Sequence, residues 1–205
     1  MARVCIFGGT FNPVHRGHLA MARAARDQHA LDLMLWTPAG HPPHKPLAGG
    51  ATTHERLTMV ELAIAGEAGF AVSPVDIARS GPSYAIETHA LLAAQYPLAE
   101  WFWLMGEDSL ADLGNWYCAC ELIGRCHWLV APRPGDRTDL DRSIEQLQQH
   151  FGGNFSVLRE FYSDISSTRV REQIATAQNI EALVPEMVAA FIYKNKLYGD
   201  PPRLN

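Results

Sequence analysis

The chain has 205 residues, of which 47% are hydrophobic and 19% charged, and its formal net charge at pH 7 is −5. These values are ordinary for a globular protein and predict one generous domain over residues 1–205. The acidic balance excludes a general nucleic-acid binder, because affinity for polyphosphate chains requires a basic surface. With neither a signal peptide nor an apolar stretch of about 18 residues, we expect a cytoplasmic protein without a membrane partner.

The first predicted strand ends in a glycine turn. Val4–Phe7 is an unbroken apolar run, which is typical of a strand buried on both faces, as in a parallel sheet. Gly8 and Gly9 follow at once, where a backbone without Cβ can turn sharply and approach a ligand closely. The next predicted element is a helix over Arg16–His29. Its free amides and positive dipole end favour an anion at this turn.

Two histidines stand at the entrance of that helix. His15 and His18 are about one helical turn apart, so both imidazoles can face the same anion. The pair predicts a phosphate site equipped with two proton-carrying or charge-stabilising side chains.

A proline-rich loop follows the second predicted strand, Leu33–Trp36. The loop spans Ala39–Gly50, and its proline density excludes a helix, so His44 and Lys45 are expected on an irregular segment. Ligands of parallel sheets bind outside the carboxyl ends of strands. The basic loop is therefore either a flexible surface segment or a phosphate clamp.

The remaining elements alternate between strands and helices. Further strands are expected over Phe70–Ser73, Trp101–Met105, His127–Val130 and Phe155–Phe161. Further helices are expected from a cap at Thr52 or Thr53, from Ser83 to about Tyr96, from Trp116 to about Gly124, over Asp139–His150, from Ile165 to about Ala177, and from Pro185 to about Asn195. This alternation predicts an α/β fold with a doubly wound, mainly parallel sheet.

Two later polar segments also follow predicted strands. Asp108 is placed for a ribose hydroxyl or a hydrated metal ion, and a helix N-cap at Asp108 would be compatible with that role. The stretch 165–171 brings hydroxyls and two arginines to a helix start. It indicates either a second phosphate cradle or an N-cap with surface arginines.

The four cysteines do not form a common metal motif. Cys118, Cys120 and Cys126 cluster without a Cys-x-x-Cys pair, and His127 belongs to an apolar strand-like run. We expect buried thiols here and no protein-held metal.

Several motifs together carry a family resemblance. Gly-Gly-Thr-Phe-Asn-Pro-Val-His-Arg-Gly-His at 8–18 resembles the signature of the HxGH nucleotidylyltransferases. Nearly end to end, the sequence is similar to the bacterial nicotinate-nucleotide adenylyltransferases. The further matching segments are Pro42–Lys45, His54–Arg56, Gly81–Tyr84, Gly106–Ser109, Trp116, Arg133–Gly135, Ile165–Arg171 and Leu197–Tyr198.

The resemblance implies a Rossmann-like fold and the transfer of AMP from ATP to nicotinate mononucleotide, with release of pyrophosphate. It also implies roles for individual residues. His15, His18, Lys45 and Arg171 would be catalytic; Gly8, Gly9, Thr10, Phe11, Asp108, Ser167 and Thr168 would bind ATP and its phosphates; Tyr84, Ala85, Ile86, Trp116 and Tyr117 would bind the pyridine substrate. Mg²⁺ would be held mainly by substrate phosphates.

Two positions depart from the family pattern. Asn12 stands where Asp is usual, and Ala85 where Thr usually follows Ser-Tyr. Asn retains an acceptor oxygen but supplies no negative charge, so reduced activity or an altered pH profile remains open. The alternatives are an enzyme preferring the amide mononucleotide, one acting on phosphopantetheine or a cytidylyl acceptor, and a non-catalytic nucleotide-binding protein. The sequence leaves the oligomeric state open.

Overall fold

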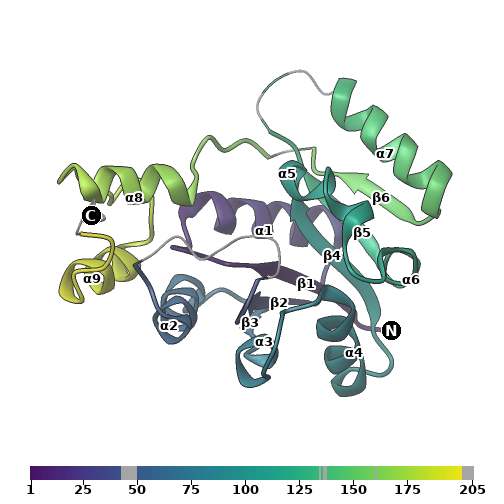
Figure 1. Ribbon diagram of the computed structural model, residues 1–205, viewed down its shortest axis with the longest axis horizontal. Coiled ribbons are helices and arrows are strands. Elements are labelled where there is room, and N and C mark those ends of the chain that lie inside the picture. The colour runs from purple at the N-terminus through teal and green to yellow at the C-terminus, as the bar shows by residue number, and fades with distance from the viewer. Residues whose placement is uncertain (43–49, 134, 136–137, 160, 200–205) are drawn as a thin grey trace.

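The computed structural model describes residues 1–42, 50–133, 135, 138–159 and 161–199. Across these residues, six parallel strands form one sheet in the order β3-β2-β1-β4-β5-β6 (Figure 1). The strands are β1 (Arg3–Gly9), β2 (Leu33–Pro38), β3 (Phe70–Val72), β4 (Glu100–Gly106), β5 (His127–Ala131) and β6 (Asn154–Val157). The predicted doubly wound α/β fold is confirmed.

Helices connect the strands. Those in the described chain are α1 (Arg16–His29), α2 (Thr53–Ile64), α3 (Val75–Ala78), α4 (Ala85–Gln95), α5 (Glu107–Leu110), the 3-10 turn η1 (Leu113–Asn115), α6 (Ala119–Ile123), α7 (Thr138–Phe151), α8 (Ser167–Ala175) and α9 (Glu186–Lys194). None of the helices in this part of the chain is long and apolar enough to cross a membrane.

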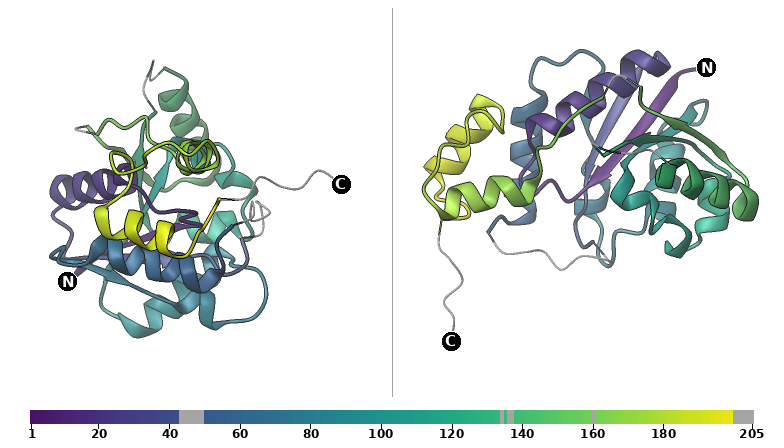
Figure 2. Two further views of the ribbon diagram at one scale, coloured as in Figure 1. Left: turned by 90° about the vertical axis from the view of Figure 1, so that its left-hand side faces the viewer. Right: turned by 90° about the horizontal axis from the view of Figure 1, so that it is seen from above.

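Strand β1 is buried on both faces, as its apolar run predicts. Cys5 and Phe7 belong to one core, which the sheet shares with α1, α2 and α9. Val4 and Ile6 belong to a second core, shared with α4, α6 and α7. Side chains alternate across a strand, so one apolar run contributes to both cores. Figure 2 shows α9 lying beside α2 on the first face.

The strand order fixes the position of the ligand site. Strands β1 and β4 are neighbours, and the sheet grows outward from them in opposite directions. The connections that leave their carboxyl ends diverge, which opens a crevice at that edge of the sheet. Gly8 and Gly9 end β1 there, and Gly106 ends β4.

Several helices and strands begin where the sequence predicts. One of them is α2, and Thr52 is its N-cap. Its side chain accepts a hydrogen bond from the Glu55 amide, and Glu55 bonds back to the Thr52 amide. This reciprocal capping box satisfies two otherwise free donors of the first turn.

Two helices begin later than the sequence predicts. Tyr84, not Ser83, occupies the N-cap of α4, because Ser83 instead exchanges hydrogen bonds of 2.8 and 3.1 Å with the His41 backbone. Helix α6 begins at Ala119 and not at Trp116, because Cys118 adopts a left-handed conformation with φ of 55°. Trp116 and Tyr117 therefore lie on a loop.

Strand β6 is shorter than the predicted Phe155–Phe161. It pairs only with β5, which ends at Ala131, and beyond Val157 the Arg159 amide donates to the Gln28 side chain at 2.9 Å. Helix α8 likewise begins at Ser167 and not at Ile165, since Ser166 caps it.

Candidate active site

A cavity of about 690 Å³ opens at the carboxyl edge of the sheet. The sequence-predicted residues on its wall are Gly8, Gly9, Thr10, Phe11, His15, His18, Tyr84, Ala85, Asp108, Trp116, Tyr117, Ser167, Thr168 and Arg171. Ile86 is not part of this wall, because its side chain is buried in the second core. Lys45 and His44 lie outside the described residues.

The predicted turn at Gly8 and Gly9 comes later in the structure, because both glycines still pair with β2 at the end of β1. Their missing Cβ atoms leave room for aromatic rings. A Cβ on Gly9 would lie 3.1 Å from the Phe11 ring, and one on Gly8 would lie 3.4 Å from Trp103. Phe11 is itself buried with φ of 47°, and its ring meets Phe7 edge-on at 5.3 Å. The chain therefore turns tightly here, and its backbone forms part of the cavity wall.

His15 and His18 cap helix α1 reciprocally. The His18 amide donates to His15 Nδ1 at 3.3 Å, and the His15 amide donates to His18 Nδ1 at 3.2 Å. The rings stack with their centroids 3.6 Å apart. Because each Nδ1 accepts a hydrogen bond, a neutral ring carries its proton on Nε2. The pair thus supplies two N–H donors beside the helix N-terminus.

Both imidazoles are held neutral. Burial, with a smaller contribution from the Arg133 charge, lowers the pKa of His15 to about 3. Burial, His15 and Arg133 lower the pKa of His18 well below its usual value. The sequence predicts that His15 and His18 carry protons or stabilise charge. In the free protein, both rings are uncharged hydrogen-bond donors.

Helix α8 is tied to the loop after β1. Ser167 Oγ donates to the Pro13 carbonyl at 2.8 Å, and Arg171 Nη1 donates to the Asn12 carbonyl at 2.7 Å. Arg171 Nη2 also contacts Thr168 Oγ1 at 3.2 Å. The two predicted phosphate cradles thus meet across more than 150 residues of sequence. The Ser167 hydroxyl has one proton, so while it bonds Pro13 its oxygen faces a ligand only as an acceptor.

Asp108 is paired with an arginine that sequence reasoning left without a role. Arg133 Nε lies 3.2 and 3.1 Å from the two Asp108 carboxylate oxygens, and its backbone amide donates to Glu107 Oε2 at 2.6 Å. Gly106, not Asp108, is the N-cap of α5. Arg133 lines the cavity two residues after β5, so a basic residue just past a strand end was the signal that could have identified it.

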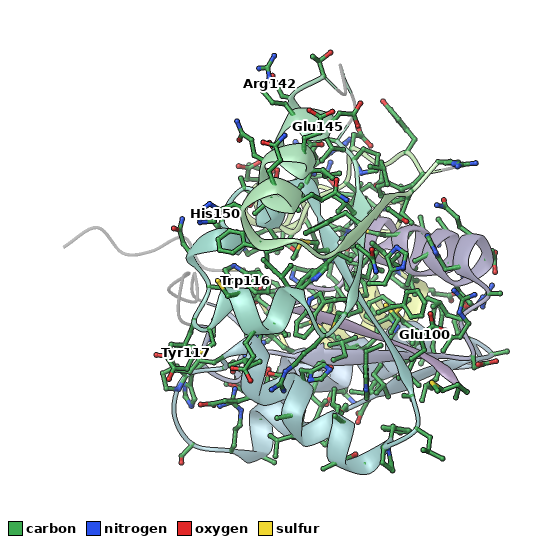
Figure 3. The ribbon with its side chains drawn as sticks, turned by 90° about the vertical axis from the view of Figure 1, so that its right-hand side faces the viewer. Glu100, Trp116, Tyr117, Arg142, Glu145 and His150 are labelled. Atoms are coloured by element: carbon green, nitrogen blue, oxygen red, sulfur yellow. The ribbon has the colours of Figure 1, made fainter. Side chains whose placement is uncertain are left out.

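Aromatic rings form the opposite end of the cavity. Tyr84 and Tyr117 lie with their centroids 4.7 Å apart, and half-buried Trp116 meets Trp103 and Trp128 edge-on at 6.2 and 6.3 Å. Trp116 therefore both packs on the core and lines the cavity. Figure 3 labels Trp116 and Tyr117. A flat ring of a ligand can stack here.

A buried carboxylate supports this aromatic end. Asp76 Oδ1 accepts from Thr88 Oγ1 at 2.7 Å and from Arg79 Nε at 3.1 Å. Burial raises the pKa of Asp76, against the effect of these two donors. Asp76 and Thr88 line the cavity, as does Tyr84. The sequence offered no signal for Asp76, because α3 is only four residues long.

Asn12 serves as a neutral acceptor. Its Oδ1 accepts a hydrogen bond of 2.7 Å from the hydroxyl of Tyr198, whose pKa burial raises, so that the proton stays on the tyrosine. The acceptor function of this position is thus preserved without a negative charge.

The prediction of buried thiols is wrong for two of the cysteines. Cys5 and Cys126 are buried, but Cys118 and Cys120 are exposed because they flank the start of the short helix α6. All four thiols are free. Within the described residues, no group of three or more His, Cys, Asp or Glu side chains is arranged to hold a metal ion.

Comparison with known proteins identifies the class of protein to which the chain belongs. Residues 6–173 match the family model described as cytidylyltransferase-like. The fold matches a Plasmodium falciparum nicotinic acid mononucleotide adenylyltransferase complexed with NaAD, with a TM-score of 0.78, coverage of 97% and 98% of the two chains, and 14% identity. The family match and the fold thus assign the chain to the nucleotidyltransferases.

Sequence comparison identifies the family within the nucleotidyltransferases. A protein of Gloeobacter violaceus (strain ATCC 29082 / PCC 7421) named a probable nicotinate-nucleotide adenylyltransferase is 60% identical over 200 residues, covering 97% of both chains. A protein of the same name from Synechococcus sp. (strain JA-3-3Ab) is 47% identical, covering 97% of this chain and 96% of the relative. The chain belongs to the nicotinate-nucleotide adenylyltransferase family.

Proposed function

We propose that this enzyme transfers AMP from ATP to nicotinate mononucleotide, which yields nicotinate adenine dinucleotide and pyrophosphate for NAD biosynthesis. The 60% identity over 97% of the chain carries the proposal. The cavity supports it, because it joins a phosphate end containing His15 and His18 to an aromatic end containing Trp116.

The reaction requires no covalent intermediate with the protein. A phosphate oxygen of the mononucleotide attacks the α-phosphorus of ATP, the bond from that phosphorus to the bridging oxygen breaks, and pyrophosphate leaves with the electron pair. The protein contributes positioning and stabilisation of negative charge. His15 and His18 would donate their Nε2 protons as hydrogen bonds to phosphate oxygens, since their Nδ1 atoms are occupied.

The other phosphate contacts are assigned to the two loops. The backbone at Gly8, Gly9, Thr10 and Phe11 would line the α-phosphate, and the first-turn amides of α8 at Ser167 and Thr168, with Arg171, would hold the β- and γ-phosphates. Lys45 is proposed to clamp the reacting phosphates, as the family resemblance implies.

Mg²⁺ is proposed to bind mainly through substrate phosphates. Phosphate and carboxylate oxygens are the ligands this ion prefers, and it usually retains several waters. Asp108 is exposed at the cavity and is the carboxylate we assign to water-mediated contact with the ion or to the ribose. The Mg²⁺ ion would neutralise charge on the triphosphate.

The aromatic end would receive the pyridine ring. Trp116 offers a stacking face, and the backbone amides near Tyr84, Ala85 and Tyr117 would receive the nicotinate carboxylate; Ile86 packs beneath them. A carboxylate accepts only, so amide donors favour it over a carboxamide. Ala85 opens α4, where the amides have no partner within the helix, which suits this recognition without the usual Thr hydroxyl.

We propose one catalytic domain that acts in the cytoplasm on ATP and the mononucleotide, without nucleic acid. Four free thiols suit a reducing compartment.

The decisive experiment follows pyrophosphate release from ATP and Mg²⁺, with nicotinate mononucleotide and nicotinamide mononucleotide offered in parallel. We expect release with the acid form, a much slower reaction with the amide, and loss of release in His18→Ala. Equal rates with both mononucleotides would contradict acid preference. ATP binding without release would support a non-catalytic protein and make Asn12→Asp the next variant to test.

A further inference from the structure

Arg56 is a buried cation that forms no part of the cavity wall. It lies in the first turn of α2, and its exposed fraction is 0%. None of the ion pairs found among the described residues includes it. Burying a charge without a carboxylate costs folding free energy, so stability alone does not account for an arginine here.

The guanidinium bonds instead to backbone carbonyls of two loops. Nη1 donates to the Thr10 carbonyl at 2.6 Å, and Nη2 donates to the Ala39 carbonyl at 2.7 Å and to Thr53 Oγ1 at 3.3 Å. Thr10 follows β1 and Ala39 follows β2, which are neighbouring strands. The two loops are also joined directly, since the Ala39 amide donates to the Gly9 carbonyl at 2.9 Å.

These bonds set the orientation of one peptide group. In a trans peptide, the carbonyl and the following N–H point in opposite directions. With its carbonyl held toward Arg56, the Thr10–Phe11 peptide directs the Phe11 amide away from Arg56. Thr10 and Phe11 line the cavity, whereas Arg56 lies behind them. The Phe11 amide is thus turned toward the side where the triphosphate would bind.

Arg56 also places positive charge behind the loop. A charge in a low-dielectric interior acts over longer distances than one in water, and no described carboxylate forms an ion pair with this one. A donor bond from a cation polarises the accepting peptide, which strengthens the hydrogen bond that its own N–H can donate.

We propose that Arg56 is a positioning residue for ATP, acting through the Thr10–Phe11 peptide; this inference rests on the proposed adenylyl transfer. Arg56 touches no substrate. It fixes the direction of a backbone donor and adds a buried positive charge, and both favour the triphosphate over an uncharged occupant.

The test compares Arg56→Met, which keeps an unbranched apolar stem without charge or donors, with Arg56→Lys, which restores the charge. Arg142→Met is the matched control, because Arg142 is exposed on the outer helix α7 (Figure 3). Binding of α,β-methylene ATP is measured by calorimetry with Mg²⁺, alongside the melting temperature and the KM of each substrate.

We expect Arg56→Met to weaken α,β-methylene ATP binding about tenfold to hundredfold, and Arg56→Lys to recover part of that loss. The KM of the mononucleotide is expected to stay within about twofold, because the aromatic end lies elsewhere in the cavity. Arg142→Met is expected to match the wild type in every measurement.

Unchanged binding of the ATP analogue in a folded Arg56→Met protein would overturn the inference, as would an equal loss of affinity for both substrates. If Arg56→Met does not fold, the Arg56→Lys protein decides. Wild-type affinity for the ATP analogue together with wild-type turnover would overturn the inference. Weaker binding of the analogue with an unchanged KM of the mononucleotide would support it. The proposed function fails separately, if wild-type protein binds the analogue but releases no pyrophosphate.

Discussion

The two ends of the cavity are built in opposite ways. At the phosphate end, His15 and Asn12 are each 6% exposed; His15 Nδ1 accepts a backbone amide and Asn12 Oδ1 accepts the Tyr198 hydroxyl. At the aromatic end, Tyr117 is 55% exposed and lies on an irregular loop between a 3-10 turn and a five-residue helix. The first end is preorganised by hydrogen bonds, whereas the second presents ring surfaces.

This difference separates chemistry from selection. Stabilising charge on a reacting phosphate requires donors that are already oriented, because reorganisation during the reaction would raise the barrier. Recognising a flat ring requires contact area, and an exposed aromatic loop supplies it. We therefore expect substitutions at the phosphate end to lower kcat, and substitutions at the aromatic end to raise KM for one substrate.

The largest effect is expected from separating the two roles of His18. In His18→Asn the side-chain oxygen can still accept the His15 amide, but the Nε2 donor is lost, so kcat should fall about 10²- to 10³-fold. His18→Gln reaches further and retains a donor near Nε2, so it should lose less. Steady-state kinetics and melting temperatures of both variants provide the measurement.

For His18→Asn and His18→Gln, the melting temperature shows whether the variant still caps helix α1. A His18→Asn protein that melts like the wild type and turns over like it would show that the imidazole acts only as a cap. Equal damage in the Asn and Gln variants would contradict the role of the Nε2 donor.

A smaller and more selective effect is expected at Trp116. Trp116→Ala removes a stacking face, so KM for nicotinate mononucleotide should rise about tenfold while KM for ATP stays nearly constant. Trp116→Phe keeps an aromatic face and is the matched control. If KM for both substrates rises equally, the tryptophan acts by packing on Trp103 and Trp128 and not by binding the pyridine.

The contrast between the ends also explains what the sequence could predict. The strand, its terminal glycines and the helix entrance lie within 16 consecutive residues, so local patterning predicted the position of His15 and His18 at the start of α1. The predicted boundaries of α1 agree with the structure at both ends. The reciprocal histidine cap, which decides the protonation of both rings, follows from backbone geometry and was not predicted.

The aromatic end was predicted less accurately. Trp116 and Tyr117 were assigned to a helix, because the left-handed turn at Cys118 has no glycine or asparagine to mark it. Arg133 and Arg56 acquire their partners only through tertiary packing. No sequence spacing predicts a carbonyl acceptor 46 residues away, as Arg56 finds in Thr10.

The smallest effect is expected from pH. The lowered pKa values of His15, about 3, and of His18 mean that both rings are neutral at pH 7 and above, so kcat/KM for ATP should vary less than about twofold from pH 7 to 8.5. That range also lies above the second phosphate pKa of about 6. A steady fall in kcat/KM across it would show that an imidazolium is required and would contradict the neutral-donor assignment.

The same shifts fix the sign of the stability change. An unfolded histidine takes up a proton near pH 6.5, whereas folded His15 and His89 resist protonation until about pH 3 and about pH 4. The unfolded state therefore binds more protons as the pH falls below about 6.5, and the free energy of unfolding decreases toward pH 4. Urea titrations at pH 7 and pH 5 measure this decrease, which His89→Phe should reduce if His89 contributes to it.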